Sequence, residues 1–367
     1  MGTTLLVSDT ESILRRTSFF ETHVAASARI VDFAGWEMPV SYRGILEEHR
    51  QVRDRVGVFD VSHMGEFMVS GSQADEFLDY VLTNRIGNCP PGKAVYSPMC
   101  NEAGGVVDDL IAYRLTEDSF LVVVNASNRE KDWRWMNERS GLFDVSLADE
   151  SEDWALLAVQ GPQAVSYLND VLEVDWSGVK RFHLLQAEVA GISIVASRTG
   201  YTGEDGFELF VRAENALELA KRLKAGDTIE WIGLGARDSL RLEAGLPLYG
   251  HELTEQISPV AAGFGWAVKE EKPRFVGKDA LQLEKQIGSE QTVRFFTVGD
   301  RRIAREEMLL YSEDEEIGKV LSGSKSPILD KPIGSALIDA SFTGDTAEVD
   351  SRGKRLPVIF AKPPLHR

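Results

Sequence analysis

The chain has 367 residues, of which 43% are hydrophobic and 27% charged, a composition typical of a globular protein with apolar material for two to three domains. Acidic residues outnumber basic ones by 58 to 40, and the net charge of −18 disfavours a general nucleic-acid or anionic-membrane surface. The two cysteines, Cys89 and Cys100, form neither a disulfide framework nor a zinc motif, so we expect reduced thiols, no bound metal and a cytosolic-type compartment.

The N-terminal part of the chain predicts two helices and no targeting segment. Residues 1–16 contain acids and lack the apolar core of a signal peptide, and no apolar run approaches the ~20 residues of a membrane span. Apolar residues at helical spacing predict a helix over 44–56. Ser72 and Asp75 have the spacing of a capping box, which predicts the start of a second helix.

The segment 101–115, NEAGGVVDDLIAYRL, places two adjacent carboxylates at the mouth of an apolar, β-branched run. Successive side chains of a strand point to opposite faces. If the strand begins at Val107, Asp109 shares a face with the apolar residues at alternate positions after it, while Asp108 faces the other way. A carboxylate on an apolar face costs several kcal/mol unless it is partnered or protonated. We therefore expect a functional partner for one of these acids.

The middle of the chain alternates strands and helices. Apolar runs predict buried strands over 120–127, ending at Asn125, and over 154–162 and 192–198. Helical spacing predicts a helix over 214–226 with a glycine cap.

A second helix over 233–245 places Arg237 and Arg241 four residues apart on one face. The charged segment 269–279, which contains proline and glycine, is the best candidate linker. Short β-type runs over 292–367 predict a small β-barrel or sandwich.

Polar residues gather at the ends of these apolar elements, while the usual phosphate-loop, dinucleotide and serine-hydrolase motifs are absent from the sequence. Carboxylates, an amide, a guanidinium and aromatic rings together suit a flat heteroaromatic ligand with hydrogen-bonding edges and an acidic tail. Each residue also has an ordinary structural interpretation, as a strand acid, an ion-paired arginine or a packed aromatic ring. The candidates are Asp109, Asn125, Glu208, Arg237, Tyr96, Tyr201 and Trp266.

Seven motifs in one order resemble the aminomethyltransferase of the glycine cleavage system, its T-protein. The resemblance extends from about residue 16 to the C-terminus. The motifs are FAGWEMPVSYRGILEEH (33–49), FDVSHMGEF (59–67), NEAGGVVDDL (101–110), VVNASN (123–128), LAVQGP (157–162), RTGYTGEDGFE (198–208) and ARDSLRLEAGLPLYGHEL (236–253).

The resemblance implies an α+β fold, a three-domain cloverleaf around a central folate channel with a small C-terminal β-barrel. We place the folate-binding aminomethyltransferase region, with two interleaved α+β subdomains, at 1–275 and the barrel domain at 276–367. The implied reaction takes the aminomethyl group from the lipoyl arm of H-protein, releases ammonia and leaves 5,10-methylenetetrahydrofolate. Tetrahydrofolate is thus a co-substrate, and we expect a monomer in the bacterial cytoplasm.

The resemblance also assigns roles to residues of this sequence. The essential family aspartate falls on Asp109, where it could relay a proton at the folate nitrogens and stabilise developing positive charge. The glutamate that grips the pterin ring matches Glu208, and the family arginine matches Arg237. Further folate-binding candidates are Met64, Tyr96, Asn125, Tyr201, Trp266 and, near the C-terminus, Arg367.

Two other functions fit the same scaffold. One is a tetrahydrofolate-dependent demethylase of a small methylated compound, and the other is a folate-binding module without turnover. The density of T-protein motifs disfavours both. An acidic H-protein would be repelled by the net charge of −18. A local basic patch would offset this repulsion, and Arg301, Arg302 and Arg305 are its candidates.

Overall fold

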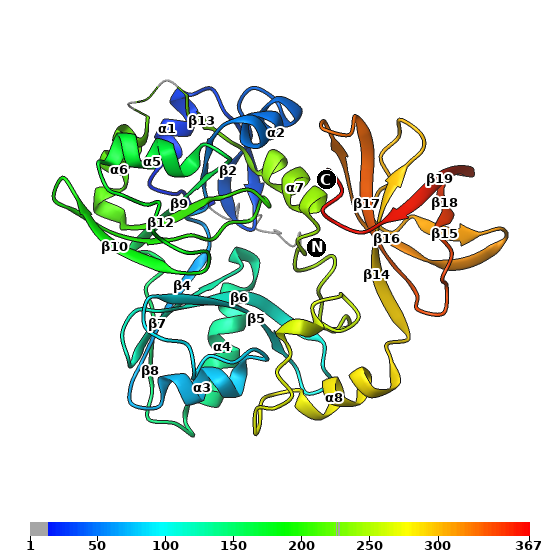
Figure 1. The fold of residues 1–367 in the computed structure, drawn as a ribbon, viewed down its shortest axis with the longest axis horizontal. Helices are drawn as coiled ribbons and strands as arrows, with labels where there is room; N and C mark the ends of the chain where they lie inside the picture. The colour runs from blue at the N-terminus through cyan, green and yellow to red at the C-terminus, as the bar shows by residue number, and fades with distance from the viewer. Residues whose placement is uncertain (1–13, 225, 227) are drawn as a thin grey trace, which may run out of the picture.

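The computed structural model describes residues 14–224, 226 and 228–367, and it has the shape of a three-lobed cloverleaf (Figure 1). Two lobes are α+β layers built on separate sheets, and the third is a barrel. Most of the N-terminal segment 1–16, for which we expected no targeting function, lies outside the described residues.

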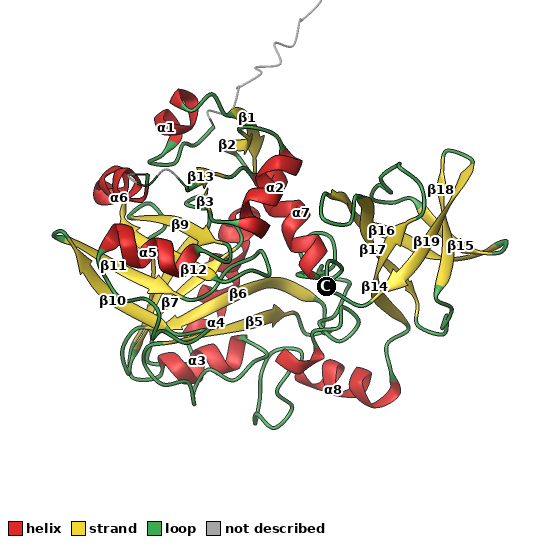
Figure 2. Ribbon diagram, turned by 45° about the horizontal axis from the view of Figure 1, so that its top comes forward, coloured by secondary structure: helices red, strands yellow, loops and turns green. Residues whose placement is uncertain are grey.

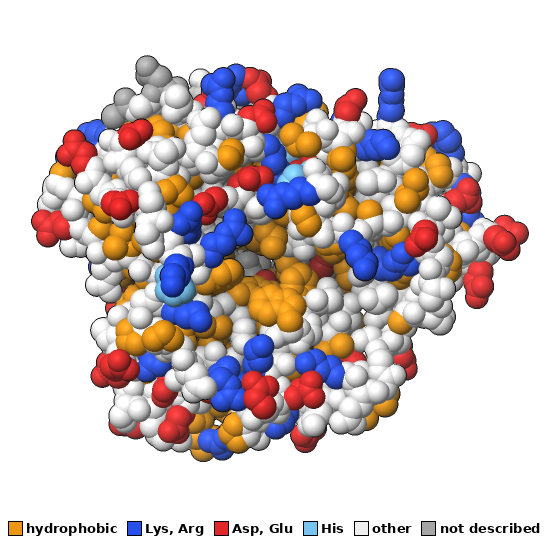
Figure 3. Space-filling model, in the orientation of Figure 1, with side chains coloured by type: hydrophobic (Ala, Val, Ile, Leu, Met, Phe, Trp, Pro, Cys, Tyr) orange, Lys and Arg blue, Asp and Glu red, His pale blue; other side chains and the backbone are white. Residues whose placement is uncertain are grey.

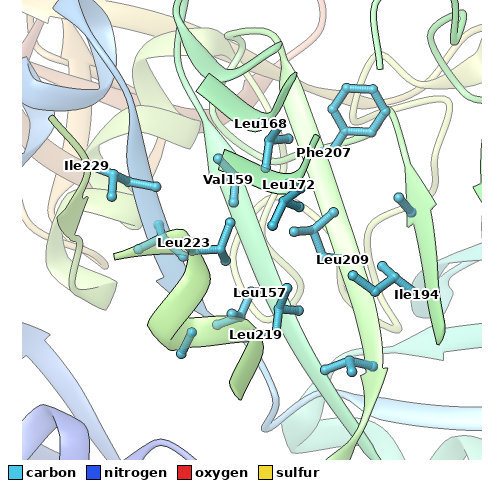
Figure 4. Packing of buried hydrophobic residues seen from close by; sticks show 14 of the residues in the cluster. Leu157, Val159, Leu168, Leu172, Ile194, Phe207, Leu209, Leu219, Leu223 and Ile229 are labelled. Atoms are coloured by element: carbon cyan, nitrogen blue, oxygen red, sulfur yellow. The ribbon is translucent and has the colours of Figure 1, made fainter. Parts of the chain in front are cut away.

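The first lobe is a six-stranded sheet in the order β10-β11-β12-β9-β3-β13. Helices α5 and α6 cover one of its faces, where leucines of the helices pack on Leu157, Val159, Phe207 and Leu209 of the strands (Figure 4). The elements of this lobe are β3 (Gly57–Asp60), β9 (Trp154–Gln160), α5 (Ala164–Leu172), β10 (Leu184–Val189), β11 (Ile192–Ser197), β12 (Gly206–Arg212), η2 (Ala213–Asn215), α6 (Ala216–Leu223) and β13 (Glu230–Trp231).

The second lobe is a five-stranded sheet in the order β5-β6-β7-β4-β8. Helices α3 and α4 cover its outer face, as Figure 2 shows, and bury Phe77 and Met136 against it. Its elements are β4 (Gly65–Ser70), α3 (Ala74–Val81), β5 (Lys93–Cys100), β6 (Val106–Arg114), β7 (Ser119–Val124), η1 (Ala126–Asn128), α4 (Arg129–Ser140) and β8 (Ser146–Asp149).

The uncovered faces of the two sheets meet each other. Phe59 and Phe210 of the first sheet pack with Tyr113 and Val123 of the second, and Leu240 of α7 (Leu234–Ala244) closes the same cluster. Polar side chains on these inner faces are therefore surrounded by protein on several sides. The remaining elements of this part of the chain are α1 (Phe20–Ala25), the two-stranded sheet of β1 (Arg29–Phe33) and β2 (Trp36–Ser41), and α2 (Ile45–Asp54), whose His49 is hydrogen-bonded to α7.

The third lobe is a closed six-stranded barrel, as predicted. Alternate residues of its last strand, Leu356, Val358 and Phe360, point into the barrel core, and pairing between the first and last strands closes the ring. Its strands are β14 (Gln291–Val298), β15 (Leu309–Ser312), β16 (Glu315–Ser326), β17 (Lys331–Asp339), β18 (Thr346–Ser351) and β19 (Lys354–Ala361).

Buried charged side chains attach the barrel to α7. Arg241 Nη1 lies 2.8 Å from Glu252 Oε2, and its Nη2 donates to Ser322 Oγ of β16 at 2.8 Å. Two residues further along the helix, Glu243 accepts a hydrogen bond from the Ser326 hydroxyl. The junction between α7 and the barrel is thus a set of paired, buried polar groups.

The segment that we predicted as a linker is irregular and leads into α8 (Lys278–Ile287), but it is fixed to the second lobe. Lys272 is only 1% exposed, and its ammonium donates to the carbonyls of Leu82 and Asn84 at 2.6 and 2.7 Å. Asp79 forms an ion pair with it at 3.6 Å. The domain boundary at 275/276 stays a prediction. The 3-10 turn η3 (Gly265–Ala267) precedes this segment.

Two details of the predicted helices are wrong. Ser72 caps no helix, because its hydroxyl donates to the Asp144 carboxylate at 2.6 Å, and α3 begins at Ala74 without a side-chain cap. The helix predicted over 214–226 ends at Leu223, where Lys224 and not a glycine occupies the C-cap.

Candidate functional site

The two adjacent acids of β6 lie on opposite faces of the second sheet. The strand begins at Val106, one residue before the predicted start, and the predicted alternation of the side chains is confirmed. Asp108 is completely buried on the face covered by α4, together with Leu110. Asp109 is partly buried on the face that meets the first lobe, the same face as Tyr113. Only Asp109 is therefore placed toward the space between the lobes.

Asp109 is held by two of the other predicted residues. The Tyr96 hydroxyl donates to its Oδ2 at 3.1 Å, and Asn125 Nδ2 donates to its Oδ1 at 3.1 Å. Burial and then the neighbouring carboxylate of Asp108 raise the pKa of Asp109 to about 7. A carboxyl group with this pKa exchanges its proton near neutral pH, which is the property of a general acid or base.

Aromatic rings form a wall next to Asp109. The ring centroids of Tyr96 and Trp266 are 5.9 Å apart, and those of Tyr96 and Phe264 are 6.3 Å apart. Trp266 is 57% exposed, unusual for an indole that serves only as core packing. The rings provide apolar surface for a flat ligand.

Glu208 faces the space between the two sheets. Its neighbours Phe207 and Leu209 point into the core of the first lobe, so the carboxylate points to the opposite face of β12. Glu208 is 8% exposed and accepts hydrogen bonds from Thr199 Oγ1 at 2.5 Å and from the Tyr113 hydroxyl at 3.0 Å. These two donors fix a negative charge in a position where solvent has little access.

Arg237 extends from the first turns of α7 toward the same space. Its guanidinium carbon lies 4.6 Å from the centroid of the Tyr201 ring, and Glu208 is among the charges that act on it. Burial lowers the pKa of this arginine. Its Nη1 is buried and has no hydrogen-bond acceptor among the described residues. A buried cationic donor without an acceptor is costly, so the site has a place for an acceptor group of a ligand.

The remaining predicted residues divide into two groups. Tyr201 donates its hydroxyl hydrogen bond to the carbonyl of Pro247, and Met64 is partly buried against the cluster between the lobes. Arg367 is placed apart, because its side chain is 61% exposed and forms its ion pair with Glu204 at 4.0 Å. No interaction among the described residues joins Arg367 to the other candidates.

Several residues of the site were missed in the sequence. Tyr113 and Thr199 orient Glu208, and Asn128 donates a hydrogen bond to Asp108 on the other side of the strand from Asp109. Tyr113 was detectable, because it lies four residues after Asp109 on the same strand face. The others gave no signal, since their roles depend on contacts between separate elements.

The surface agrees with a site between the lobes. Figure 3 shows a recessed patch of hydrophobic side chains at the centre of the molecule, bordered by lysine and arginine side chains. A separate cavity of about 940 Å³ lies beside α4 and is lined by Arg15, Trp36, Arg129 and Trp133 among others. None of the predicted site residues lines that cavity, and its arginines Arg15 and Arg129 both form ion pairs with Glu152. Among the helices of the described residues, none combines the length and the hydropathy that spanning a bilayer requires.

Comparison with known proteins identifies two family domains. The family model described as "GCVT N-terminal domain" matches residues 19–272, and the one described as "Glycine cleavage T-protein C-terminal barrel domain" matches residues 291–366. The aminomethyltransferase of Desulfitobacterium hafniense (strain DSM 10664 / DCB-2) is 45% identical over 359 residues, which cover 95% of this chain and 98% of that protein.

Two further similarities cover almost the whole chain. The aminomethyltransferase of Geobacillus thermodenitrificans (strain NG80-2) is 45% identical over 362 residues, which cover 97% of this chain and 99% of that protein. The crystal structure of glycine cleavage system aminomethyltransferase T from Bartonella henselae superimposes with a TM-score of 0.91 at 34% identity, covering 96% of this chain and 98% of that one.

Proposed function

The chain belongs to the glycine cleavage T-protein family, and from this premise we propose which of its residues perform the reaction of a tetrahydrofolate-dependent aminomethyltransferase. The enzyme transfers a one-carbon unit from the aminomethyl-dihydrolipoyl arm of H-protein to tetrahydrofolate and releases ammonia. The full-length similarity to aminomethyltransferases does not favour the demethylase or the non-catalytic folate binder.

The side chains between the lobes fit a folate. The two hydroxyl donors of Glu208 both bind its Oε2, which leaves Oε1 available to accept hydrogen bonds from the aminopyrimidine edge of a pterin. Arg237 has a buried donor that needs an acceptor. Met64, Tyr96 and Trp266 offer apolar and aromatic surface, and Asn125 and Tyr201 complete the proposed set. Arg367 is the least supported member, because its described ion pair is with Glu204.

Asp109 is the proposed catalytic residue. Tetrahydrofolate supplies the nitrogen that takes up the one-carbon unit. In its ionised form, Asp109 stabilises positive charge that develops on the transferred carbon, and its Oδ atoms accept or return a proton. The observation that supports this role most directly is a carboxyl group with a pKa of about 7, held by Tyr96 and Asn125 on the face toward Glu208 and Arg237.

Ammonia release from aminomethylated, lipoylated H-protein tests the proposal. With tetrahydrofolate, Asp109→Asn is expected to lose roughly 10²-fold or more of the turnover of the unmodified enzyme, the usual scale for one acid–base group. Folate binding should persist, because Glu208 and Arg237 are unchanged. Asp170→Asn, which removes an exposed carboxylate of α5, is the matched control and should retain full turnover. Full activity of Asp109→Asn would contradict the assignment.

For the docking of H-protein, we propose the three arginines at the start of the barrel. Arg301, Arg302 and Arg305 are exposed, and Arg302 is only partly neutralised by Asp300 at 3.6 Å. Reversing all three charges should lower kcat/KM for H-protein severalfold at low salt and leave folate binding unchanged, because steering between charged surfaces acts on association. An unchanged rate with H-protein would exclude this surface.

A further inference from the structure

On the face of β6 opposite Asp109 lies a pair of buried carboxyl groups that the reaction described above does not use. Asp108 of β6 and Asp132 of α4 are both completely buried, and each is among the groups that shift the pKa of the other. An ionised carboxylate accepts hydrogen bonds only, so two ionised carboxylates cannot form one with each other. Two neighbouring buried anions would also repel each other, so one of the two groups retains its proton.

The donors around the pair show which acid is ionised. Asp108 accepts three hydrogen bonds: from the Asn125 amide nitrogen at 3.0 Å, from Asn125 Nδ2 at 2.8 Å and from Asn128 Nδ2 at 2.6 Å. Neither oxygen of Asp132 receives a hydrogen bond from an N–H or hydroxyl group of any residue that the structure describes. Donors stabilise the charged form of a carboxyl group, so the charge belongs to Asp108 and the proton to Asp132.

Charged groups nearby do not alter this assignment. Lys131 points its ammonium at the carbonyl of Val107 and the hydroxyl of Tyr249, both at 2.6 Å, and lies 3.8 Å from Glu255. Tyr96 meets Asp109 from β5, and the Tyr201 hydroxyl is bonded elsewhere. Within the described part of the chain, no lysine, arginine or histidine forms an ion pair with any of the three aspartates.

We propose that Asp132 is a positioning residue that stays protonated at neutral pH and donates a hydrogen bond to Asp108, holding it as a fixed anion behind Asp109. The inference rests on the proposed function of Asp109. The fixed anion acts on Asp109 in two ways. First, the negative charge of Asp108 opposes the ionisation of Asp109. Second, Asn125 Nδ2 donates to a carboxylate oxygen of each acid, so the position of Asp108 helps to fix that of Asp109.

The direction of the pKa shifts agrees with this arrangement. Burial raises the pKa of Asp132 well above the ordinary value, and the charge of Asp108 raises it further. The pKa of Asp108 is also raised by burial, against which the hydrogen bonds from Asp132, Asn125 and Asn128 act. Loss of the Asp132 donor would therefore favour protonation of Asp108, and a neutral Asp108 would no longer raise the pKa of Asp109.

Two variants of Asp132 separate a positioning role from a merely structural one. Asp132→Asn keeps the shape and offers an amide N–H to Asp108, so the pH dependence of kcat/KM should match the unmodified enzyme. Asp132→Ala removes the donor, so the acidic limb of kcat/KM should move to lower pH by about one unit, the size of a typical single-charge effect. A lower rate with an unmoved acidic limb in Asp132→Ala, or a displaced limb in Asp132→Asn, would overturn the positioning role.

Infrared absorption of protonated carboxyl groups tests the proton itself without reference to catalysis. At about pH 8.5, where Asp109 with its pKa of about 7 is ionised, the holoprotein in D₂O should show a carboxylic-acid C=O band that Asp132→Asn lacks. Subtraction of the variant spectrum is required, because Glu66 is also buried without a donor among the described residues and contributes its own band. Identical spectra would refute the protonated Asp132. A band that depends on Asp132 together with a fully active Asp109→Asn would instead refute the role of Asp109 and leave the carboxyl pair intact.

Discussion

Two arginines one helical turn apart on α7 have opposite surroundings. Arg241 is 1% exposed, and its guanidinium is paired with Asp238 at 2.9 Å, with Glu252 at 2.8 Å and with Ser322 at 2.8 Å. Arg237 is stacked near Tyr201 and retains a buried Nη1 without an acceptor among the described residues. The protein thus supplies acceptors for the guanidinium donors of Arg241, whereas one guanidinium donor of Arg237 has no acceptor among the described residues.

The comparison distinguishes a charged side chain that stabilises the fold from a charged side chain that is available to a ligand. The folded chain completes the hydrogen bonds of Arg241, so nothing else has to bind there, and the residue joins α7 to the barrel. Arg237, like Asp109, is held at a cost that a bound ligand would offset. The four predictions below test the comparison between the satisfied and the incomplete groups, and they begin with the largest expected effect.

Replacing the satisfied arginine should mainly affect stability. Arg241→Met would leave Glu252 buried without its cation, and removal of one partner of a buried pair typically costs about 3–5 kcal/mol of the free energy of unfolding. Arg237→Met should cost less than about 1 kcal/mol, because it removes a donor that has no partner. Urea denaturation of both variants measures the two free energies of unfolding. Equal losses in the two variants would contradict the distinction between the paired and the unpaired arginine.

Replacing the incomplete arginine should mainly affect ligand binding. Arg237→Met is expected to weaken tetrahydrofolate binding roughly 10- to 100-fold, the equivalent of one charged hydrogen bond. Arg181→Met, which removes an exposed arginine, is the control and should bind normally. Titration calorimetry gives the dissociation constants. If the dissociation constant of Arg237→Met for tetrahydrofolate is unchanged, the free Nη1 donor of Arg237 does not bind tetrahydrofolate and serves another ligand group.

The pH dependence of the reaction should follow Asp109. Because the ionised form is the active one, kcat/KM should rise as pH increases through about 7 and fall about tenfold for each unit below it. Stopped-flow assays between about pH 5.5 and 8.5 measure this limb. Its absence in the unmodified enzyme would show that the ionisation of Asp109 does not limit the rate.

The smallest expected effect is a gain of stability in an inactive variant. The fold raises the pKa of Asp109 and thus favours its protonated form, so stability is lost as pH rises from the ordinary aspartate pKa of about 4 toward 7. Asp109→Asn cannot ionise and avoids this loss. We expect a gain of about 1 kcal/mol at pH 8 and none near pH 4, because near pH 4 Asp109 is protonated in the folded protein and ionisation costs it no stability. Thermal denaturation at both pH values measures the difference, and a gain at pH 4 would contradict the explanation.

The sequence predicted those parts of the site that depend on local periodicity. Alternation along β6 separated Asp108 from Asp109, and the position of Glu208 between Phe207 and Leu209 placed it on the face opposite the core. The barrel followed from short β-type runs, and the helices around 44–56 and 233–245 followed from residue spacing of helical period.

The parts that failed depend on distant contacts. Ser72 had the spacing of a cap, but Asp144, 72 residues later, competes for its hydroxyl. Tyr113 and Glu208 are 95 residues apart and meet only because two sheets pack face to face. Arg241 gains one of its acceptors, Ser322, from a barrel strand 81 residues further along the chain, which no local pattern reveals.

The paired charges at the junction of α7 and the barrel also bear on the synthesis of the protein. Ser322, Ser326 and β19 emerge from the ribosome well after α7, and β19 is needed to close the barrel. Until then Arg241 and Glu243 lack their serine donors and acceptors from the barrel. A nascent or prematurely terminated chain would therefore expose part of the α7 surface, with its charges incompletely paired, to chaperones and proteases.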